Sequence, residues 1–169
     1  YRDLEDAGGV LLVGEPRVYV LIENMIKTIS SCFSSGIIHL GMDEAFSLGK
    51  GKYRDLHGDR DPVEIMREHV DKVLQIMRKY NVKPEMWGDM YFRLAYGAYD
   101  TGKVSFDKSE EVRKTMPKDV KIHYWDYYSL DKEHYIDYTN KFKKITDNIV
   151  FDGGVWNYLG FIPDNTYSI

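Results

Sequence analysis

The alternation of apolar and polar residues predicts helices that are separated by short buried strands. Pro16 opens a first helix, whose apolar residues recur at helical spacing as far as Phe33. A second helix is predicted after Asp61 and Pro62, an acidic cap followed by proline at the first helical position. A third helix is predicted over 131–145. The apolar faces of the second and third helices consist of Met66, Val70, Val73, Leu74 and Met77, and of Tyr135, Tyr138, Phe142 and Ile145.

Short apolar runs between these helices predict the strands. They lie at 37–40, 82–86, 120–125 and 149–151, and a further short strand or loop edge is expected at 10–13. Strands that alternate with helices favour a parallel sheet with right-handed crossovers. The pattern is typical of an α/β fold, either a doubly wound sheet or a β/α barrel, and periodicity alone does not separate the two.

Two long polar segments interrupt this alternation. The segment at 45–60 is rich in glycine and charged residues and follows a strand directly, which is typical of an active-site loop. A mobile surface loop would have the same composition, and both interpretations stay open. The segment at 91–116 has no regular pattern apart from a short helical turn around 109–114.

The strand at 37–40 ends at Gly41 and is followed by two adjacent acids, Asp43 and Glu44. Active sites of parallel-sheet proteins lie at the carboxyl ends of the strands. Two carboxylates held close in apolar surroundings oppose each other's ionisation, so one is expected to have a pKa above its ordinary value. That pair suits general acid catalysis at a glycosidic bond. The alternative is that Asp43 caps a downstream segment and Glu44 is solvated.

Composition narrows the function further. The chain has 169 residues, of which 43% are hydrophobic and 30% charged, enough for one domain with its own core. A net charge of −4 without a basic patch argues against nucleic acid or an anionic membrane as partner, and no apolar run is long enough to span a bilayer. The single cysteine, Cys32, is expected to be a core thiol and is consistent with a cytoplasmic location. Three Trp and fourteen Tyr suit either sugar stacking or core packing.

Four motifs in this order resemble those of the family 20 glycoside hydrolases, the β-N-acetylhexosaminidases. They are His39-x-Gly41-x-Asp43-Glu44, the tryptophan of 85–89, Tyr124-x-Asp126, and the tryptophan of 153–156. The resemblance implies a (β/α)8 barrel. Because only four clear strands are present, residues 1–169 are expected to form about half of that barrel, as a single partial catalytic domain.

The resemblance also implies a mechanism. Glu44 would be the general acid that protonates the leaving oxygen and later the base that activates water. Asp43 would orient the 2-acetamido group of the substrate, whose carbonyl oxygen attacks the anomeric carbon. An oxazolinium intermediate would form, and the configuration would be retained. The expected activity is release of terminal N-acetylglucosamine or N-acetylgalactosamine from glycans.

Further residues of the site follow from the same resemblance. Tyr124 would donate a hydrogen bond to the acetamide oxygen, and Asp126 would bind sugar hydroxyls. Trp87 and Trp156 would line the pocket, whereas strand alternation places Trp125 on the opposite side from Tyr124. Without the resemblance, Tyr124 is interpreted as a core residue and Asp126 as a cap.

His39 has two interpretations. It is a buried, hydrogen-bonded histidine at the strand end that supports the acid, or it is a metal ligand together with His57 and Asp43. The ligand spacing is poor for a metal, and the resemblance implies neither metal nor cofactor, so the supporting role is assigned. In place of the acidic residue that the family often has two positions after the last tryptophan, this chain has Tyr158.

Half a barrel leaves two sheet edges unpaired, so we expect self-association or the missing N-terminal half of the barrel to cover them. The arginine that grips the sugar in the family belongs to the first barrel strand, which lies outside these residues. Turnover by the chain alone is therefore expected to be weak. Two other functions stay open, an inactive sugar-binding fragment and a metal-dependent hydrolase of the same fold.

Overall fold

The strands form a parallel sheet in the computed structural model, which describes residues 2–99 and 107–154. The sheet has the order β1-β2-β3-β4, and helices alternate with the strands along the chain. The four strands are β1 (Ile37–His39), β2 (Lys83–Trp87), β3 (Lys121–Trp125) and β4 (Ile149–Asp152). Each lies within one or two residues of the prediction, so the predicted strands and their parallel arrangement are confirmed.

Two compact units divide the chain, residues 1–85 and 86–169, and the boundary falls inside β2. In unit 1, His39 of β1 pairs with Glu85 of β2. In unit 2, Trp125 of β3 pairs with Asp152 of β4. The interpretation of 1–169 as one domain stays a prediction, and the two units are described separately below.

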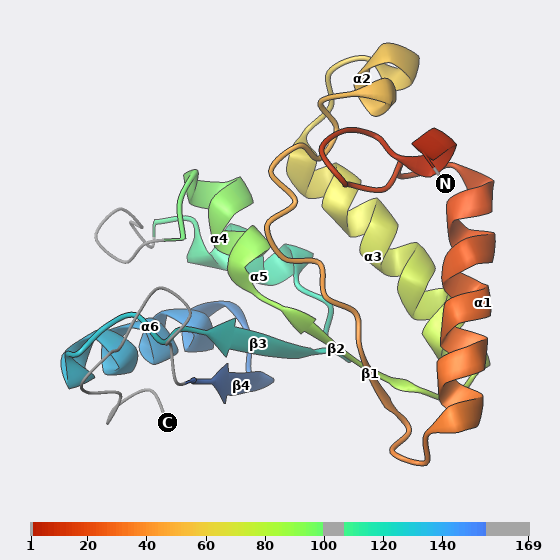
Figure 1. Cartoon of the computed structure of the whole chain (residues 1–169). Coiled ribbons are helices and arrows are strands. Elements are labelled where there is room, and N and C mark those ends of the chain that lie inside the picture. The colour runs from red at the N-terminus through yellow and green to blue at the C-terminus, as the bar shows by residue number, and fades with distance from the viewer. Residues whose placement is uncertain (1, 100–106, 155–169) are drawn as a thin grey trace, which may run out of the picture. The chain divides into compact units, whose positions relative to one another are not determined.

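Unit 1 is built on two long helices, α1 (Pro16–Cys32) and α3 (Pro62–Lys79), which lie side by side (Figure 1). Both helices begin as the sequence predicts, with a proline in the first turn. An acidic N-cap accepts a hydrogen bond from the backbone, Glu15 for α1 and Asp61 for α3. The helices meet in an apolar cluster that consists of Ile26, Val73, Met77 and Val82.

Cys32 is exposed at the end of α1, so the prediction that it is a core thiol is wrong. The helical period placed Cys32 near the apolar positions of α1. However, the last turn of that helix is largely exposed, from Ser31 to Phe33, because no described element packs over it. Periodicity gives the face of a helix but not the length over which that face is covered.

The polar segment at 45–60 is more ordered than the sequence suggests, because it contains a helix, α2 (Lys52–His57). The buried carboxylate of Asp6 holds its start: it accepts hydrogen bonds from the backbone N–H groups of Gly49, Gly51 and Tyr53 at 2.8, 3.2 and 2.8 Å. A Cβ on Gly51 would lie 2.3 Å from the backbone oxygen of Asp6, which is why glycine is required there. The anchor is more than 40 residues away in sequence and left no local signal.

Unit 2 contains α4 (Asp89–Tyr96), α5 (Ser109–Thr115) and α6 (Lys132–Ile145). The sequence predicted α5 and α6, and the four expected core residues of α6 are buried. Helix α4 was missed, because consecutive buried residues, Met90, Tyr91 and Phe92, hide the helical period. No helix among the described residues has both the length and the apolar character needed to cross a membrane.

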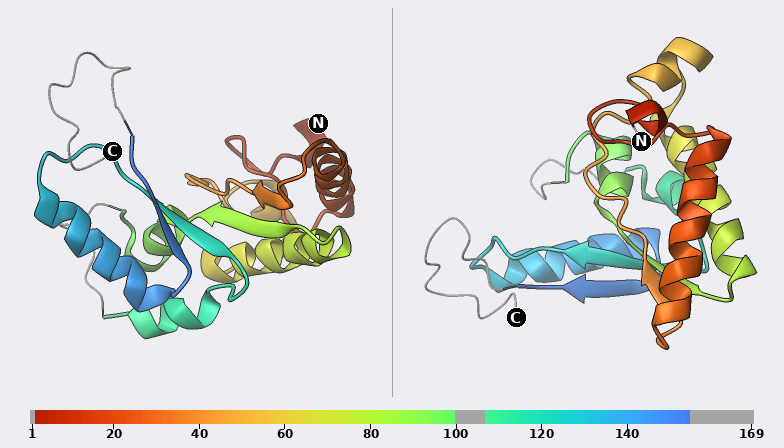
Figure 2. Two further views of the ribbon diagram at one scale, coloured as in Figure 1. Left: turned by 90° about the horizontal axis from the view of Figure 1, so that it is seen from below. Right: turned by 45° about the vertical axis from the view of Figure 1, so that its right-hand side comes forward.

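Helix α6 covers one face of β3 and β4 (Figure 2). The ring of Tyr124 stacks on those of Phe142 and Tyr138 of α6, with centroids 5.0 and 5.3 Å apart. On the same face, a Cβ on Gly88 would lie 2.4 Å from Phe142 and 2.7 Å from Ile122. The chain therefore passes from β2 to α4 through a position that only glycine fits.

Candidate functional site

The turn after β1 is held in a strained backbone conformation. Met42 and Glu44 have φ angles of 70° and 48°, and Gly41 has 71°. The left-handed region costs a residue with a side chain about 1–3 kcal/mol, and such strain is concentrated at functional sites. The Gly41 N–H donates to Nδ1 of His39 at 3.1 Å, and the Phe46 N–H donates to the carbonyl oxygen of Glu44 at 2.7 Å. Short local hydrogen bonds thus hold the acidic pair in a fixed backbone.

The side chains of Asp43 and Glu44 are exposed. The pair is therefore not enclosed by apolar groups in the described chain, and the expectation of low-dielectric surroundings is wrong. Asp43 does not cap a helix either, because the next helix, α2, begins after Gly51. His39 is exposed as well, so the expected burial of this residue is also wrong, although its ring supports the turn through Gly41.

Asp43 and Glu44 line a cavity of about 490 Å³ within unit 1. Asp43, Glu44 and His39 contribute its polar lining at the end of β1. Its apolar lining includes Leu21, Ile22, Met25, Ile26 and Ile29 of α1. Carboxylates beside an apolar wall provide both hydrogen-bond acceptors and a surface for C–H groups, which is the composition of a small-molecule site.

His69 of α3 also lines this cavity and is a polar residue that the sequence did not single out. Burial, and to a smaller extent the charge of the nearby Lys72, lowers the pKa of His69 to about 4. Its Nδ1 lies 3.2 Å from the hydroxyl of Tyr19. The imidazole is therefore neutral at pH 7 and contributes a hydrogen-bonding group without charge.

Strand alternation separates two faces of the sheet in unit 2. Tyr124 is completely buried and contacts Phe151, its register partner, and the aromatic residues of α6. His123 and Trp125 lie on the opposite face, and the ring of Trp87 meets that of His123 edge to face at 5.7 Å. The predicted separation of Tyr124 from Trp125 is confirmed, but Tyr124 lies on the face that α6 covers.

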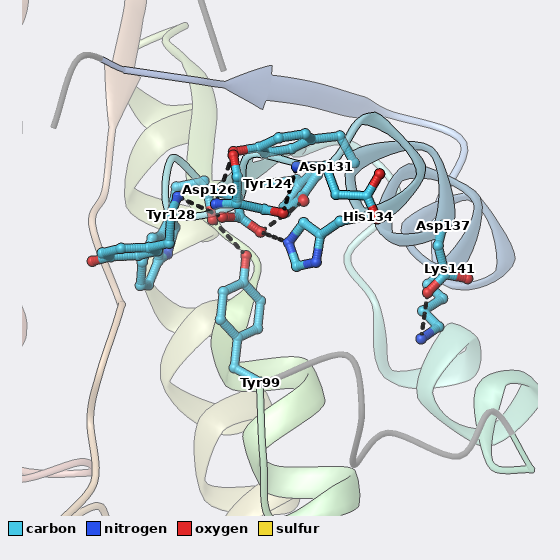
Figure 3. A network of polar contacts seen from close by, with 11 residues as sticks. Tyr99, Tyr124, Asp126, Tyr128, Asp131, His134, Asp137 and Lys141 are labelled. Atoms are coloured by element: carbon cyan, nitrogen blue, oxygen red, sulfur yellow. Dashed lines mark hydrogen bonds and ion pairs between the residues drawn. The ribbon is translucent and has the colours of Figure 1, made fainter. Parts of the chain in front are cut away.

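Asp126 is buried and accepts hydrogen bonds from three donors (Figure 3). The Tyr124 hydroxyl donates to Oδ2 at 2.9 Å, the Tyr128 backbone N–H donates to Oδ1 at 3.2 Å, and Nε2 of His134 lies 2.6 Å from Oδ2. Burial and the carboxylate raise the pKa of Tyr124, which keeps its hydroxyl protonated as a donor. These are the contacts of a core tyrosine and a turn-capping acid.

Asp152 and His123 form a pair that sequence reasoning missed. Nδ1 of His123 lies 2.5 Å from Oδ2 of Asp152, at the end of β4. Their position carried a signal, because Asp152 follows an apolar strand and precedes glycine, as the acids after β1 and β3 follow their strands. The pair lies on the face that also carries Trp87 and Trp125.

The predicted site residues are divided between the units. His39, Asp43 and Glu44 belong to unit 1, and Trp87, Tyr124 and Asp126 to unit 2. Trp156 and Tyr158 lie outside the described residues. Within 2–99 and 107–154, no group of three or more His, Cys, Asp or Glu side chains could hold a metal ion, so the alternative metal site at His39, Asp43 and His57 gains no support.

Comparison with solved structures finds proteins of similar fold. A β-N-acetylhexosaminidase matches with a TM-score of 0.56 and 18% sequence identity, over 90% of this chain and 29% of that protein. The GH20 β-N-acetylhexosaminidase from Streptomyces coelicolor A3(2) matches with a TM-score of 0.51 and 12% identity, over 95% of this chain and 26% of that protein. The chain is structurally similar to β-N-acetylhexosaminidases.

At 12–18% identity, this likeness concerns the fold. It confirms the predicted fold class, a parallel sheet with alternating helices that corresponds to about half of a (β/α)8 barrel. The chain spans less than a third of the length of the hexosaminidases that it matches. No family model and no curated protein sequence matches the chain.

Proposed function

We propose that the chain is part of a retaining exo-β-N-acetylhexosaminidase that uses substrate-assisted catalysis. The observation that carries this proposal is the strained turn after β1, which presents Asp43 and Glu44 side by side at the carboxyl end of a parallel strand. The fold of two β-N-acetylhexosaminidases supports it. The substrate would be a glycan with a terminal N-acetylglucosamine or N-acetylgalactosamine.

In this proposal, Glu44 donates a proton to the leaving glycosidic oxygen and later accepts one from water. Asp43 accepts the N–H of the 2-acetamido group, which turns the carbonyl oxygen towards the anomeric carbon. Bond formation by that oxygen releases the leaving group and gives an oxazolinium ion, whose positive charge Asp43 offsets. Water then attacks the anomeric carbon from the face that the leaving group occupied and breaks its bond to the acetamide oxygen, so two inversions retain the configuration.

The proposal assigns the other site residues to support of the turn and to binding of the sugar. His39 holds the turn through Gly41, and Trp87 supplies an aromatic surface for the sugar. Trp156 is the second proposed wall. Tyr124 and Asp126 are proposed to hold the acetamide and the hydroxyls, but their mutual hydrogen bond would have to open first. Their share of the binding is therefore expected to be small.

Two probes test the proposal. A thiazoline mimic of the cyclised intermediate should bind the chain, and Asp43→Asn should weaken that binding about tenfold or more, because it removes the carboxylate that faces the ring nitrogen. The matched control is Asp59→Asn, another exposed carboxylate of unit 1. Hydrolysis of an aryl N-acetyl-β-glucosaminide should also exceed that of the corresponding β-glucoside, which lacks the amide. Equal thiazoline affinity of wild type and Asp43→Asn would contradict the mechanism.

A sugar-binding chain without turnover is the second candidate. The exposure of Glu44 favours it, because a carboxyl group in water lacks the apolar surroundings that keep a general acid protonated. This candidate predicts thiazoline and N-acetylglucosamine binding of similar strength and no hydrolysis. Substrate-assisted catalysis predicts much tighter binding of the thiazoline.

A further inference from the structure

Unit 2 has an uncovered polar group on the sheet face opposite α6. Asp152 closes β4 and stands beside Trp125 in the register of the two strands. Its side chain is 34% exposed, although its neighbour His123 is only 10% exposed. The strand fixes the start of this side chain, and its carboxylate group remains accessible.

His123 fixes the orientation of this carboxylate. Because a carboxylate only accepts hydrogen bonds, Nδ1 of His123 carries the proton and donates to Oδ2 of Asp152. The ring of His123 is itself held edge to face by Trp87, with the two planes at 88°. The aspartate is therefore oriented by a histidine that packing has already immobilised.

The second carboxylate oxygen, Oδ1, is the one left for a ligand. Among residues 2–99 and 107–154, the side chain of Asp152 has no partner besides His123. Asp126 differs in that both of its oxygens accept hydrogen bonds from the chain. Of the acid that follows β3 and the acid that ends β4, it is the latter, Asp152, that has an oxygen available to accept a hydrogen bond from a ligand.

We propose that Asp152, oriented by His123, binds hydroxyl groups of the sugar ring beside the indole of Trp87. A carboxylate oxygen accepts strongly from sugar hydroxyls, and an aromatic surface next to it suits the C–H groups of a pyranose. The inference rests on the proposed function for the identity of the sugar, an N-acetylhexosamine. Asp152 is a binding residue in this scheme, and His123 is a positioning residue.

The test follows N-acetylglucosamine binding to the full chain by NMR, through the indole N–H signals of the three tryptophans. A Trp87→Phe variant identifies the Trp87 signal. Addition of sugar should shift that signal in the wild type. Asp152→Asn should raise the dissociation constant about tenfold, because the amide is a weaker acceptor than the carboxylate.

Substitutions at His123 separate positioning from folding. His123→Asn keeps an N–H donor near the position of Nδ1 and should stay within about threefold of the wild-type affinity. His123→Phe keeps the ring packing but not the donor, and should bind as weakly as Asp152→Asn. Asp137→Asn, at an exposed carboxylate of α6, is the matched control and should leave the affinity unchanged. Urea unfolding of each variant identifies any that fails to fold.

The outcomes distinguish this inference from the proposed function. In one outcome, sugar binding depends on Asp152 and thiazoline binding does not depend on Asp43. That outcome would support the inference and contradict the hexosaminidase mechanism. Thiazoline binding that depends on Asp43, with equal sugar affinity of wild type and Asp152→Asn, would overturn the inference alone. A Trp87 signal that does not respond to sugar in the wild type would also overturn it.

Discussion

The turns after β1 and β3 both place acidic residues at the carboxyl end of a parallel strand, yet they are built in opposite ways. After β1, Asp43 and Glu44 are exposed and the backbone is strained at Met42 and Glu44. After β3, Asp126 is buried and accepts hydrogen bonds from three donors. An acid at a strand end is therefore not in itself evidence of catalysis.

The two turns differ in what their carboxylates contribute. The donors around Asp126 make it part of the folded structure, because removing a buried acceptor leaves each donor unsatisfied. The carboxylates after β1 contribute little to folding, and the backbone there has an unfavourable conformation. Backbone strain at residues whose side chains add little to stability is typical of functional sites. The first two of the four predictions below test this contrast, and all four are ordered from the largest expected effect to the smallest.

Glu44→Gln should slow hydrolysis of an unactivated N-acetylhexosamine disaccharide by about 10²–10⁴-fold, because proton donation to the leaving oxygen is lost. An aryl substrate with a good leaving group should be affected much less in its first step. The free energy of unfolding should change by less than about 0.5 kcal/mol, since the side chain is exposed. Unchanged hydrolysis of the disaccharide would remove Glu44 from the mechanism.

Asp126→Ala should lower the free energy of unfolding by about 3 kcal/mol, measured by urea denaturation. The substitution leaves the Tyr124 hydroxyl, the Tyr128 N–H and His134 without their acceptor. Asp43→Ala is the matched control at the other turn and should cost less than about 0.5 kcal/mol. Similar losses for the two variants would abolish the contrast between the turns.

Gly88→Ala should destabilise the chain by about 2–3 kcal/mol, because the new methyl group would overlap Phe142 and Ile122 beneath α6. Gly154→Ala is the control, since its Cβ would meet Tyr127 at an ordinary contact distance of 3.6 Å. Thermal unfolding of both variants measures the difference. If Gly88→Ala unfolds at the wild-type temperature, the packing between the sheet and α6 is looser than the structure shows.

His69 should make unit 1 sensitive to mild acid. Its folded pKa of about 4 lies below the ordinary value of 6.5, so the unfolded chain binds the proton more readily. Stability is therefore unaffected above about pH 7 and falls as pH drops from 6.5 towards 4. By pH 5 the loss should reach about 2 kcal/mol. Urea unfolding of wild type and His69→Phe at pH 8 and pH 5 measures it, and an equal pH dependence in both would exclude His69 as the cause.

Local patterns in the sequence were sufficient for most of the fold. The helices that begin at Pro16 and Pro62 were predicted because caps, proline and apolar spacing all act within one turn of helix. The order of the segment at 45–60 and the helix α4 were not predicted. Asp6 fixes the first from more than 40 residues away, and the second is buried on too many sides to show a period.

The candidate site was predicted less completely. Alternation separated Tyr124 from Trp125, but a period of two does not say which face a helix will cover. Helix α6 covers the Tyr124 face, and this leaves His123 and Asp152 on the other. Their pairing joins residues 29 apart in sequence, so only the register of β3 and β4 brings them together.

By itself, the sequence determined where the strands and most of the helices lie, and that acids follow the first and third strands. Those features depend on residues that are neighbours in the chain. Only the tertiary structure decided which acids are enclosed by donors and which remain accessible. Burial of a carboxylate depends on groups that folding brings from distant segments, and no local pattern records them.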